Sequence, residues 1–421
     1  MRERRRVVVT GLGLVSPQGD DPARAFSALL EGRSAIRLTP LGEAPHGCTI
    51  ASAVCADFDA AAKLGKQRLM TMDRVSALGT VAAQAAWADA GLGDLGEAER
   101  EAACVMWGTG AGGIQTLERG YRDLFLRNRP RLSPLSVVQG MNNAAAAQVA
   151  QLLGLGGAVF TYSVACASSA VAIAEAARRV AAGECDVAIG GGSEAALPYG
   201  TVRAWQSMMV LAPAESEAQA ERACRPFAAD RAGLVLGEGA AVLVLEERNH
   251  AMARGASIYA ELAGSGASCD HGHLTAPAAE GQLRALRAAL RDAEASPDDV
   301  GYVNAHGTAT LEGDPVEIDA LRRLFGESAR RVQVSATKSM HGHLMGASGA
   351  IEALITVLAV QQGRIPPTAH VDAVDPACAG VDHVLGAGRD VAALPLAISN
   401  SFAFGGSNQV LVLRAHAAGG P

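Results

Sequence analysis

One of the eight cysteines in this 421-residue sequence stands in a setting that suits nucleophilic chemistry. Cys166 follows Phe160-Thr-Tyr-Ser-Val164, a stretch typical of a strand, and it opens a segment with helical apolar spacing, 166–183. A strand-to-helix turn holds a nucleophile at a tight, exposed corner. The unpaired N–H groups of the helix start favour a thiolate over a thiol and can stabilise an oxyanion. We therefore predict that Cys166 is a nucleophile; the alternative is a buried structural cysteine.

Two histidines lie where strand-like stretches end, as an acid–base pair would require. His306 follows an apolar stretch in Tyr302-Val-Asn-Ala-His-Gly-Thr-Ala-Thr310, and threonine hydroxyls follow it at Thr308 and Thr310. His343 lies between another strand-like stretch and a helical segment. A single loop histidine is often structural, but two at strand ends, together with Cys166, predict a Cys–His–His catalytic site.

A glycine-rich loop, Ser401-Phe-Ala-Phe-Gly-Gly-Ser-Asn408, is a candidate gate. A mobile Phe404 could cover a pocket, and the loop backbone could donate a hydrogen bond there. The alternative is a tight turn with two packed rings, Phe402 and Phe404. Gly108-Thr-Gly-Ala-Gly-Gly113 has the letters of a dinucleotide-binding motif but lacks the acidic residue at the required distance, so we interpret it as pocket wall.

A cluster of metal-ligating residue types, Cys269-Asp-His-Gly-His273, matches no standard ligand spacing, and His341 and His343 do not complete one. We therefore predict no metal site. We expect Asp270, His273 and Thr275 to form a polar loop at a pocket mouth.

The elements that must position these residues alternate between strands and helices, which predicts mostly parallel sheets covered by helices on both faces. Strands are predicted at 7–10, 105–107, 158–164, 186–190, 301–303 and 332–335, and helices at 77–90, 148–153 and 283–293.

Two pairs of segments repeat along the chain. Gly237-Glu-Gly-Ala-Ala-Val-Leu-Val-Leu245 parallels Gly405-Gly-Ser-Asn-Gln-Val-Leu-Val-Leu413, and 166–183 parallels 346–363. The similar offsets in the same order predict two homologous halves, residues 1–250 and 251–421. In that arrangement His343 approaches the same pseudo-symmetric centre as Cys166. The alternative is coincidence between common α/β segments.

Composition restricts the class of protein. Charged residues make up 19% of the chain, too few for a long disordered chain, and no apolar run reaches the ~20 residues of a membrane helix. The net charge of −7 argues against bulk nucleic-acid binding. The basic start lacks the long apolar run of a signal peptide, and the scattered cysteines form no C-x-x-C pair, so we expect a cytoplasmic protein.

Together, these motifs resemble the β-ketoacyl synthase family of the thiolase-like superfamily, with most likeness to elongating synthase II and to ketosynthases of type II polyketide systems. The resemblance covers nearly the whole chain and rests on Arg5-Arg-Val-Val-Val-Thr-Gly-Leu-Gly-Leu-Val-Ser-Pro17, Ala165-Cys-Ala-Ser168, Arg225-Pro-Phe227, Gly237-Glu-Gly239, Asn304-Ala-His-Gly-Thr308, Lys338-Ser339, Gly342-His-Leu344 and Asn400-Ser-Phe-Ala-Phe-Gly-Gly406.

The resemblance implies an α/β fold, a five-layered α-β-α-β-α sandwich of two pseudo-symmetric halves. It also implies a decarboxylative condensation in fatty acid or polyketide biosynthesis. Cys166 would take an acyl group from acyl carrier protein, and malonyl carrier protein would then lengthen it by two carbons. His306 and His343 would hold the malonyl thioester carbonyl. No resident cofactor is implied, because the substrates arrive on the phosphopantetheine of the carrier protein.

The resemblance implies further roles around the site. The backbone N–H groups of Cys166 and Phe404 would form the oxyanion hole. Lys338 would orient and polarise the site, paired with Glu352, while Asp314 and Glu317 would be structural. The expected substrate-binding residues are Thr308, Thr310, Ala111, Phe402 and Thr275.

The chain departs from the family pattern at three positions. Ala403 stands where the gating loop usually has Gly, which puts the mobility of the gate in question. His341 replaces a commoner Thr. Ala111 replaces the bulky aliphatic residue of the synthase II pocket and should deepen or widen the acyl tunnel. These departures favour a specialised polyketide or polyene ketosynthase.

The resemblance implies two kinds of partner: acyl carrier protein, and either a second copy of the chain or a chain-length factor. Retention of Cys166 argues against the alternative function, a non-catalytic chain-length factor that only shapes the tunnel, because Gln replaces the cysteine there. Carrier proteins are acidic, so we expect a basic docking patch; the alternative is a solvated surface. The candidate residues are Lys63, Lys66, Arg68, Arg127, Arg129 and Arg131.

Overall fold

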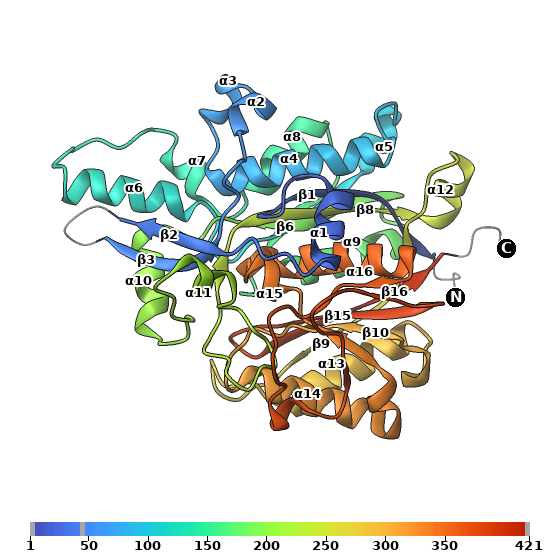
Figure 1. Ribbon diagram of the computed structural model, residues 1–421. Coiled ribbons are helices and arrows are strands. Elements are labelled where there is room, and N and C mark those ends of the chain that lie inside the picture. The colour runs from blue at the N-terminus through green and yellow to red at the C-terminus, as the bar shows by residue number, and fades with distance from the viewer. Residues whose placement is uncertain (1–4, 43–46, 417–421) are drawn as a thin grey trace.

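The computed structural model describes residues 5–42 and 47–416. Figure 1 shows five layers: α4 and α8 cover one sheet layer, α9 and α16 fill the centre, and α13 and α14 cover the second sheet layer. The predicted α-β-α-β-α sandwich is therefore confirmed. Within the described ranges, no helix is long and apolar enough to cross a membrane.

The large sheet contains β1 (Val7–Val15), β4 (Cys104–Gly108), β5 (Val159–Tyr162), β6 (Val187–Glu194), β8 (Gly239–Glu247), β9 (Ala260–Cys269), β10 (Tyr302–Asn304), β11 (Gln333–Ser335), β13 (Asp382–His383), β15 (Leu396–Phe402) and β16 (Ser407–Ala415). The small sheets contain β2 (Arg37–Leu41), β3 (Cys48–Ala53) and β7 (Leu236–Gly237), and β12 (Arg364–Ile365) with β14 (Arg389–Asp390).

The helices are α1 (Pro22–Leu30), α2 (Ala60–Leu64), α3 (Lys66–Leu69), α4 (Arg74–Asp89), α5 (Glu97–Ala102), α6 (Ile114–Phe125), α7 (Ser136–Gly140), α8 (Ala144–Leu153), α9 (Ser168–Ala182), α10 (Tyr199–Ser207), α11 (Glu217–Glu221), α12 (Arg248–Ala253), α13 (Ala279–Asp292), α14 (Gly313–Phe325), α15 (Lys338–His341) and α16 (Ser348–Gln362). Short 3₁₀ turns lie at η1 (Pro297–Asp299), η2 (Gly326–Arg331), η3 (Met345–Ala347) and η4 (Pro376–Cys378).

Strand order shows the duplication directly. The first half runs β5-β4-β6-β8-β1, and the second runs β11-β10-β15-β16-β9, with the same sequence of parallel and antiparallel pairings. The two layers join where β1 pairs with β9 over two residue pairs. The predicted divide between residues 250 and 251 remains a prediction; it falls within α12, the helix that connects the halves in the chain.

The predicted repeat segments occupy equivalent places in the two halves. The Val-Leu-Val-Leu stretches form β8 and β16, which are buried almost throughout, as their continuous apolar runs predict. The repeated helices become α9 and α16, which pack against each other at the centre and end at the left-handed glycines Gly183 and Gly363. A Cβ atom on Gly349 would come within 2.6 Å of the Ala170 Cβ, so only glycine permits this close packing.

All nine predicted elements are present, with shifted boundaries. The strand β9 was missed because its sequence, Ala-Glu-Leu-Ala-Gly-Ser-Gly-Ala-Ser-Cys, is dominated by small residues. The fold explains that composition: a Cβ atom on Gly266 would lie 2.2 Å from the Ala285 carbonyl oxygen of α13. Close packing of the helix on the strand thus excludes the β-branched residues that ordinarily mark a strand.

Candidate active site

The turn that carries Cys166 is fixed by its own hydrogen bonds. The Ser168 hydroxyl accepts a hydrogen bond from the Val164 N–H at 2.8 Å and donates one to the Ala165 carbonyl at 2.6 Å. Ala165 adopts a φ of 44°, a conformation that costs free energy for a non-glycine residue. This strained corner places the Cys166 side chain at the start of α9, as predicted, but the residue is only 5% exposed.

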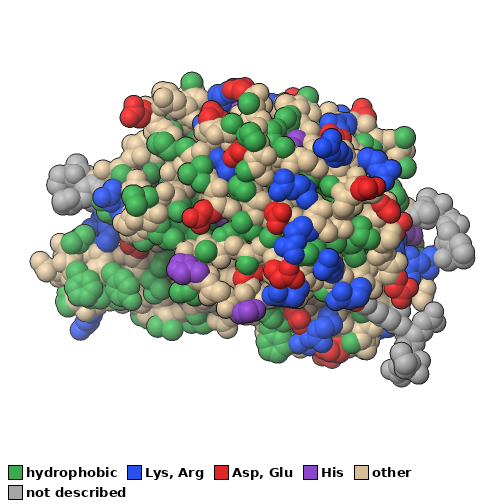
Figure 2. Space-filling model, turned by 90° about the horizontal axis from the view of Figure 1, so that it is seen from below, with side chains coloured by type: hydrophobic (Ala, Val, Ile, Leu, Met, Phe, Trp, Pro, Cys, Tyr) green, Lys and Arg blue, Asp and Glu red, His purple; other side chains and the backbone are tan. Residues whose placement is uncertain are grey.

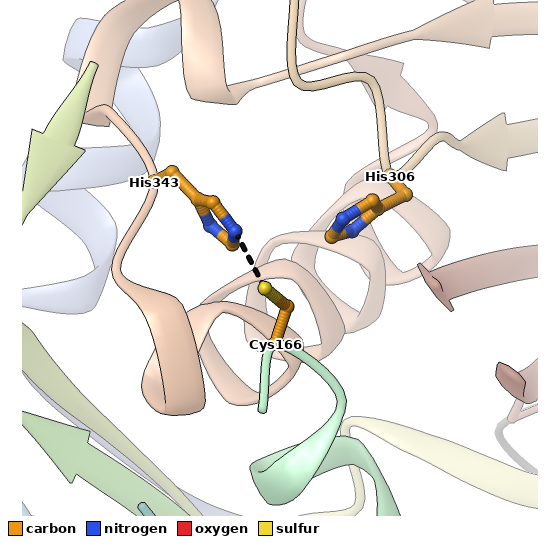
Figure 3. Close-up of side chains that lie close together, drawn as sticks. All are labelled: Cys166, His306 and His343. Atoms are coloured by element: carbon orange, nitrogen blue, oxygen red, sulfur yellow. Dashed lines mark hydrogen bonds between the residues drawn. The ribbon is translucent and has the colours of Figure 1, made fainter. Parts of the chain in front are cut away.

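His343 reaches Cys166 from the other half of the molecule. Its Nε2 lies 3.0 Å from the Cys166 Sγ (Figure 3). Its Nδ1 lies 2.7 Å from the Ser348 Oγ. Because Ser348 is the first residue of α16, the two repeated helices bring nucleophile and histidine together at their starts. The structure therefore confirms the sequence expectation that His343 approaches the same centre as Cys166.

His306 faces the same point from the loop after β10. Its ring meets that of His343 edge-on, with ring centres 5.4 Å apart (Figure 3). The Lys338 Nζ lies 3.3 Å from the His306 Nδ1 and donates to the His306 carbonyl at 2.6 Å. Since an ammonium group only donates, Nδ1 must accept, and the ring hydrogen is therefore on Nε2. His306 thus has an N–H donor available for substrate.

Lys338 is fully buried and forms an ion pair with Glu352, which is also fully buried. Burial raises the pKa of Glu352 to about 7, and the nearby ammonium opposes that rise. The pair joins α15 to α16. Lys338 does not line the cavity, so it contacts His306 from the protein interior.

Burial sets the protonation states of the resting site. It raises the pKa of Cys166 to about 12, although Lys338 and a hydrogen bond from the Phe404 backbone N–H oppose the rise. The predicted preference for a thiolate is thus wrong for the resting enzyme, because desolvation outweighs the helix start. Burial and the Lys338 charge lower the pKa values of His306 and His343 well below the ordinary range, so both rings are neutral.

Two buried carboxylates hold the loop that contains His306. Glu317 accepts hydrogen bonds from the His306 and Gly307 N–H groups, both at 2.9 Å. Asp314 accepts from the Thr308 and Ala309 N–H groups, both at 3.1 Å. Asp314 and Glu317 therefore support the loop backbone, and burial raises the pKa values of both groups.

A cavity of about 410 Å³ opens onto Cys166 and the two histidines. Its wall includes several residues that the sequence singled out: Cys166, Thr275, His306, Thr308, Thr310, Asp314, Glu317, His343, Phe402 and Phe404. Exposed apolar side chains of Met209, Leu274 and Leu311 surround its mouth. Figure 2 shows hydrophobic side chains gathered at the end of this face where α10 lies, with charged side chains interspersed elsewhere.

Of the predicted catalytic, substrate-binding and supporting residues, three lie outside this cavity wall, and so do His273 and the loop 108–113 that the sequence predicted at the pocket. Lys338 and Glu352 are buried beneath it, and Ala111 is absent from its lining. The backbone N–H of Ala111 donates to Glu194 at 3.2 Å. Glu194, a fully buried carboxylate that the sequence analysis missed, also accepts from the Gly346 N–H at 3.0 Å and so links this loop to the turn after His343.

The candidate gate is held on two sides. The Phe404 ring stacks on Trp205 of α10, with ring centres 5.9 Å apart and planes at 21°, a contact that the sequence analysis did not foresee. The Gly405 N–H donates to the Leu274 carbonyl at 2.7 Å. The left-handed backbone of this loop falls on Gly405 and Gly406, whereas Ala403 does not have a positive φ. The alanine at that position is therefore compatible with the observed loop.

His341 fits without disturbing the site. It is fully buried, with Nδ1 2.8 Å from the Gly342 carbonyl and Nε2 3.0 Å from the Thr337 Oγ1. Burial, followed by the Lys338 charge, lowers its pKa to about 3, so the ring is neutral.

The nitrogen and sulfur atoms of Cys166, His306 and His343 lie within 4.8 Å of one another, close enough to act on a single substrate group. Among the described residues, they are also the one such group of metal-ligating types. The Lys338 ammonium 3.3 Å from the His306 Nδ1 would repel a cation here, so the geometry suits covalent catalysis with hydrogen-bond donors better. Cys269, His271 and His273 are exposed and form no such group.

Comparisons with known proteins agree with this geometry. Residues 4–251 match the N-terminal domain of beta-ketoacyl synthases, and residues 259–372 match the C-terminal domain. Nodulation protein E of Rhizobium sp. (strain N33) is 42% identical over 413 residues, covering 97% of this chain and 99% of that protein. The 3-oxoacyl-[acyl-carrier-protein] synthase 2 of Staphylococcus aureus (strain COL) is 38% identical over 417 residues, covering 98% of this chain and 99% of that protein.

Solved structures extend the likeness to three dimensions. The ishigamide ketosynthase/chain length factor superposes with a TM-score of 0.90 at 31% identity, covering 99% of this chain and 100% of that chain. A beta-ketoacyl synthase from Burkholderia phymatum STM815 superposes with a TM-score of 0.89 at 35% identity, covering 98% of this chain and 100% of that chain. With its Cys–His–His site in place, the chain belongs to the beta-ketoacyl synthase family.

Proposed function

We propose that this protein condenses an acyl group, carried on Cys166, with a malonyl thioester of acyl carrier protein. The observation that carries the proposal is the 3.0 Å contact between the Cys166 Sγ and the His343 Nε2, with the His306 ring on the same side. A nucleophile with an adjacent base splits the reaction into two easier steps.

In the first step, Cys166 attacks the carbonyl carbon of the acyl carrier thioester. The neutral His343 accepts the thiol proton, which a buried thiol with a pKa of about 12 does not release to water near neutral pH. The Phe404 N–H, which donates a hydrogen bond to Cys166, and the Cys166 N–H are the proposed oxyanion donors. The carrier thiol then leaves with the proton, and the acyl group remains on sulfur.

In the second step, the malonyl thioester loses carbon dioxide. The electrons of the broken C–C bond form an enolate, whose oxygen would accept hydrogen bonds from the Nε2–H of His306 and from the Nε2–H of His343. For this step His343 takes the tautomer in which its Nδ1 accepts from the Ser348 hydroxyl, whereas in the first step Nε2 is the acceptor. The enolate carbon attacks the acyl carbonyl and expels the Cys166 sulfur as a thiolate, which takes up one proton from solvent. The products are carbon dioxide, free Cys166 and a β-ketoacyl thioester two carbons longer.

Acylation of Cys166 tests this proposal against a non-catalytic role in shaping the tunnel of a partner. Incubation with acyl carrier thioesters should add one acyl mass to the wild-type chain and none to Cys166→Ala, as read by mass spectrometry. An acylated Cys166→Ala chain, or an unmodified wild-type chain, would contradict the catalytic assignment.

The carrier's phosphopantetheine arm would enter along Thr308 and Thr310. Their hydroxyl oxygens lie 3.2 Å apart on the cavity wall, where they could bond to the amides of the arm. Thr275 and Phe402 line the same cavity and complete the proposed substrate-binding set.

We propose that the protein pairs with a second molecule of the same fold, either a copy of itself or a chain-length factor. Among the residues that the structure describes, no strand pairs with the outer side of the edge strand β5, and its Phe160 side chain is 49% exposed. The α6–α7 arm, which projects from the body in Figure 1, carries the exposed apolar side chains of Phe125, Leu126 and Val137. Native mass spectrometry of the purified chain should show a homodimer; a monomer that dimerises only with a co-expressed homologue would assign the heterodimer.

The proposed carrier-docking patch includes Lys66 and Arg68 of α3 and the arginines that follow α6. Arg129 lies 3.6 Å from Asp123, and both Arg129 and Arg131 are exposed. Reversing both charges should raise the KM for acyl carrier protein but leave that for a small thioester unchanged. An unchanged KM for acyl carrier protein would remove the patch from the proposal.

We propose that the enzyme accepts long or polyunsaturated chains in a specialised polyketide or polyene pathway. Support comes from the structural likeness to the ishigamide ketosynthase/chain length factor. The small Ala111 side chain is a second argument: it lies outside the cavity lining, but Glu194 ties its backbone to the turn after His343. Condensation rates with saturated and polyenoyl carrier thioesters of equal length test this. Equal or faster turnover of the saturated chain would favour fatty acid synthesis instead.

A further inference from the structure

A buried arginine that the reaction does not use lies directly behind the cavity wall. The Arg231 side chain is 2% exposed, although it carries a full positive charge. Its Nη1 group donates to the Ala228 carbonyl at 2.9 Å and to the Asp375 carboxylate at 2.6 Å. A buried charge must be paired and hydrogen-bonded to be tolerated, and this one is.

The remaining donors of Arg231 point at the threonine loop, residues 308–311. Its Nε donates to the Thr310 carbonyl at 2.9 Å, and its Nη2 donates to the Leu311 carbonyl at 3.0 Å. The loop needs such support, because Ala309 has a φ of 64° and the Leu311 side chain is 68% exposed. The guanidinium therefore holds an irregular segment that has little packing of its own.

Two charged groups hold complementary parts of this loop. Asp314 accepts the N–H groups of Thr308 and Ala309, and Arg231 donates to the carbonyls of the two residues that follow. The two side chains lie 3.8 Å apart, so each also neutralises the other. The backbone of residues 308–311 is therefore held at its N–H groups by Asp314 and at its carbonyl groups by Arg231, and this fixes where the two threonine hydroxyls lie.

The support of the catalytic histidine is separate. Glu317 binds the N–H groups of His306 and Gly307, and Lys338 binds the His306 carbonyl. No hydrogen bond of Arg231 among the described residues reaches His306. Loss of Arg231 should therefore disturb the threonines and leave the reacting groups in place.

We propose that Arg231 is a positioning residue for the carrier arm: it sets the Thr308 and Thr310 hydroxyls at the spacing that binds pantetheine. This inference rests on the proposed function, in which these hydroxyls bind the arm. Lysine cannot replace arginine here, because its single nitrogen cannot reach carbonyls and a carboxylate in several directions at once.

The test compares two acyl thioesters that differ only in the arm. One is an acyl pantetheine; the other is the same acyl group on N-acetylcysteamine, which lacks the pantoyl part and one amide. In Arg231→Lys, the KM for the pantetheine thioester should rise about tenfold, the scale of one or two lost hydrogen bonds, with kcat within twofold. The kinetic constants for N-acetylcysteamine thioester should be unchanged.

The matched control is Arg222→Lys. Arg222 also pairs with an aspartate of the same C-terminal segment, Asp372, at 2.7 Å, but both groups are exposed and away from the cavity. This variant should bind both thioesters as the wild type does. The positioning role is supported if Arg231→Lys raises the KM for the pantetheine thioester but not for the N-acetylcysteamine thioester, and Arg222→Lys raises neither.

Equal losses on both thioesters in Arg231→Lys, or no loss on either, would overturn the positioning role while the condensing activity stands. A wild-type protein that uses neither thioester nor acyl carrier protein would overturn the proposed function and the positioning role with it. If Arg231→Lys does not fold, Asp375→Asn keeps the arginine but removes the carboxylate that accepts its hydrogen bond at 2.6 Å, and the same comparison of the two thioesters decides.

Discussion

Replacing Lys338 with methionine tests how the buried ion pair supports the site. Glu352 is fully buried, its Oε1 bonds to Lys338, and its Oε2 has no hydrogen-bond partner among the described residues. Removing the ammonium leaves an uncompensated buried carboxylate, which costs about 3–5 kcal/mol of unfolding free energy. The double variant Lys338→Met/Glu352→Gln removes both charges and should recover most of that loss.

The loss of unfolding free energy in Lys338→Met should depend on pH. Burial already raises the pKa of Glu352 to about 7, and the ammonium that opposes this rise is gone in the variant. For an acid whose pKa is higher in the folded than in the unfolded state, stability is greatest at low pH and falls as the pH rises through the folded-state value. The variant should therefore come closest to wild-type stability at pH 5 and fall furthest below it at pH 8.

Urea unfolding at pH 5 and pH 8 measures both effects, and malonyl decarboxylation measures the chemistry. In the double variant, His306 loses the donor that places its hydrogen on Nε2, so decarboxylation should slow by up to about 100-fold, the scale for one lost oxyanion donor. Acylation of Cys166 should change less. A single variant as stable as the double variant at pH 8 would refute the assigned role of the pair.

Three further predictions concern access to the site. Ala111→Ile should shorten the longest chain that the enzyme accepts, measured by product length with a series of acyl carrier thioesters; unchanged lengths would remove Ala111 from the tunnel. Trp205→Ala removes the ring that stacks on Phe404, so a bulky maleimide should label Cys166 about two- to tenfold faster, the value of one aromatic contact; an unchanged rate would mean that the stack does not restrain the gate. In the wild type, iodoacetamide labelling of Cys166 should rise about tenfold per pH unit between pH 7 and 9, because burial raises its pKa to about 12; a plateau below pH 9 would contradict that value.

The residue patterns predicted an α/β fold of two homologous halves and the convergence of Cys166 and His343, while the five layers were implied by the family resemblance. Continuous valine–leucine runs marked β8 and β16, and the repeat related α9 to α16. The sequence could not reveal contacts between distant segments that use common residue types. Arg231 and Glu194 act through hydrogen bonds to backbone groups of other segments, and no local pattern predicts those partners.

The protonation state of Cys166 shows the same limit. Its place at a helix start was visible in the sequence, but its 5% exposure arises from the other half of the chain and from the gate loop packed around it. Desolvation is a property of the assembled core, so the direction of the pKa shift could be settled only in three dimensions.

The contact between α9 and α16 has a consequence for how this catalyst can change. With Gly349 against Ala170, and the Ser169 hydroxyl accepting the Ala350 N–H at 2.9 Å, the two helices cannot move relative to each other without breaking several contacts at once. The reacting groups therefore tolerate almost no variation, whereas the surrounding loops do not share that restriction. New substrate ranges should therefore arise by exchange of those loops while the α9–α16 pair stays unaltered. Loops from related enzymes could be recombined around the same helix pair.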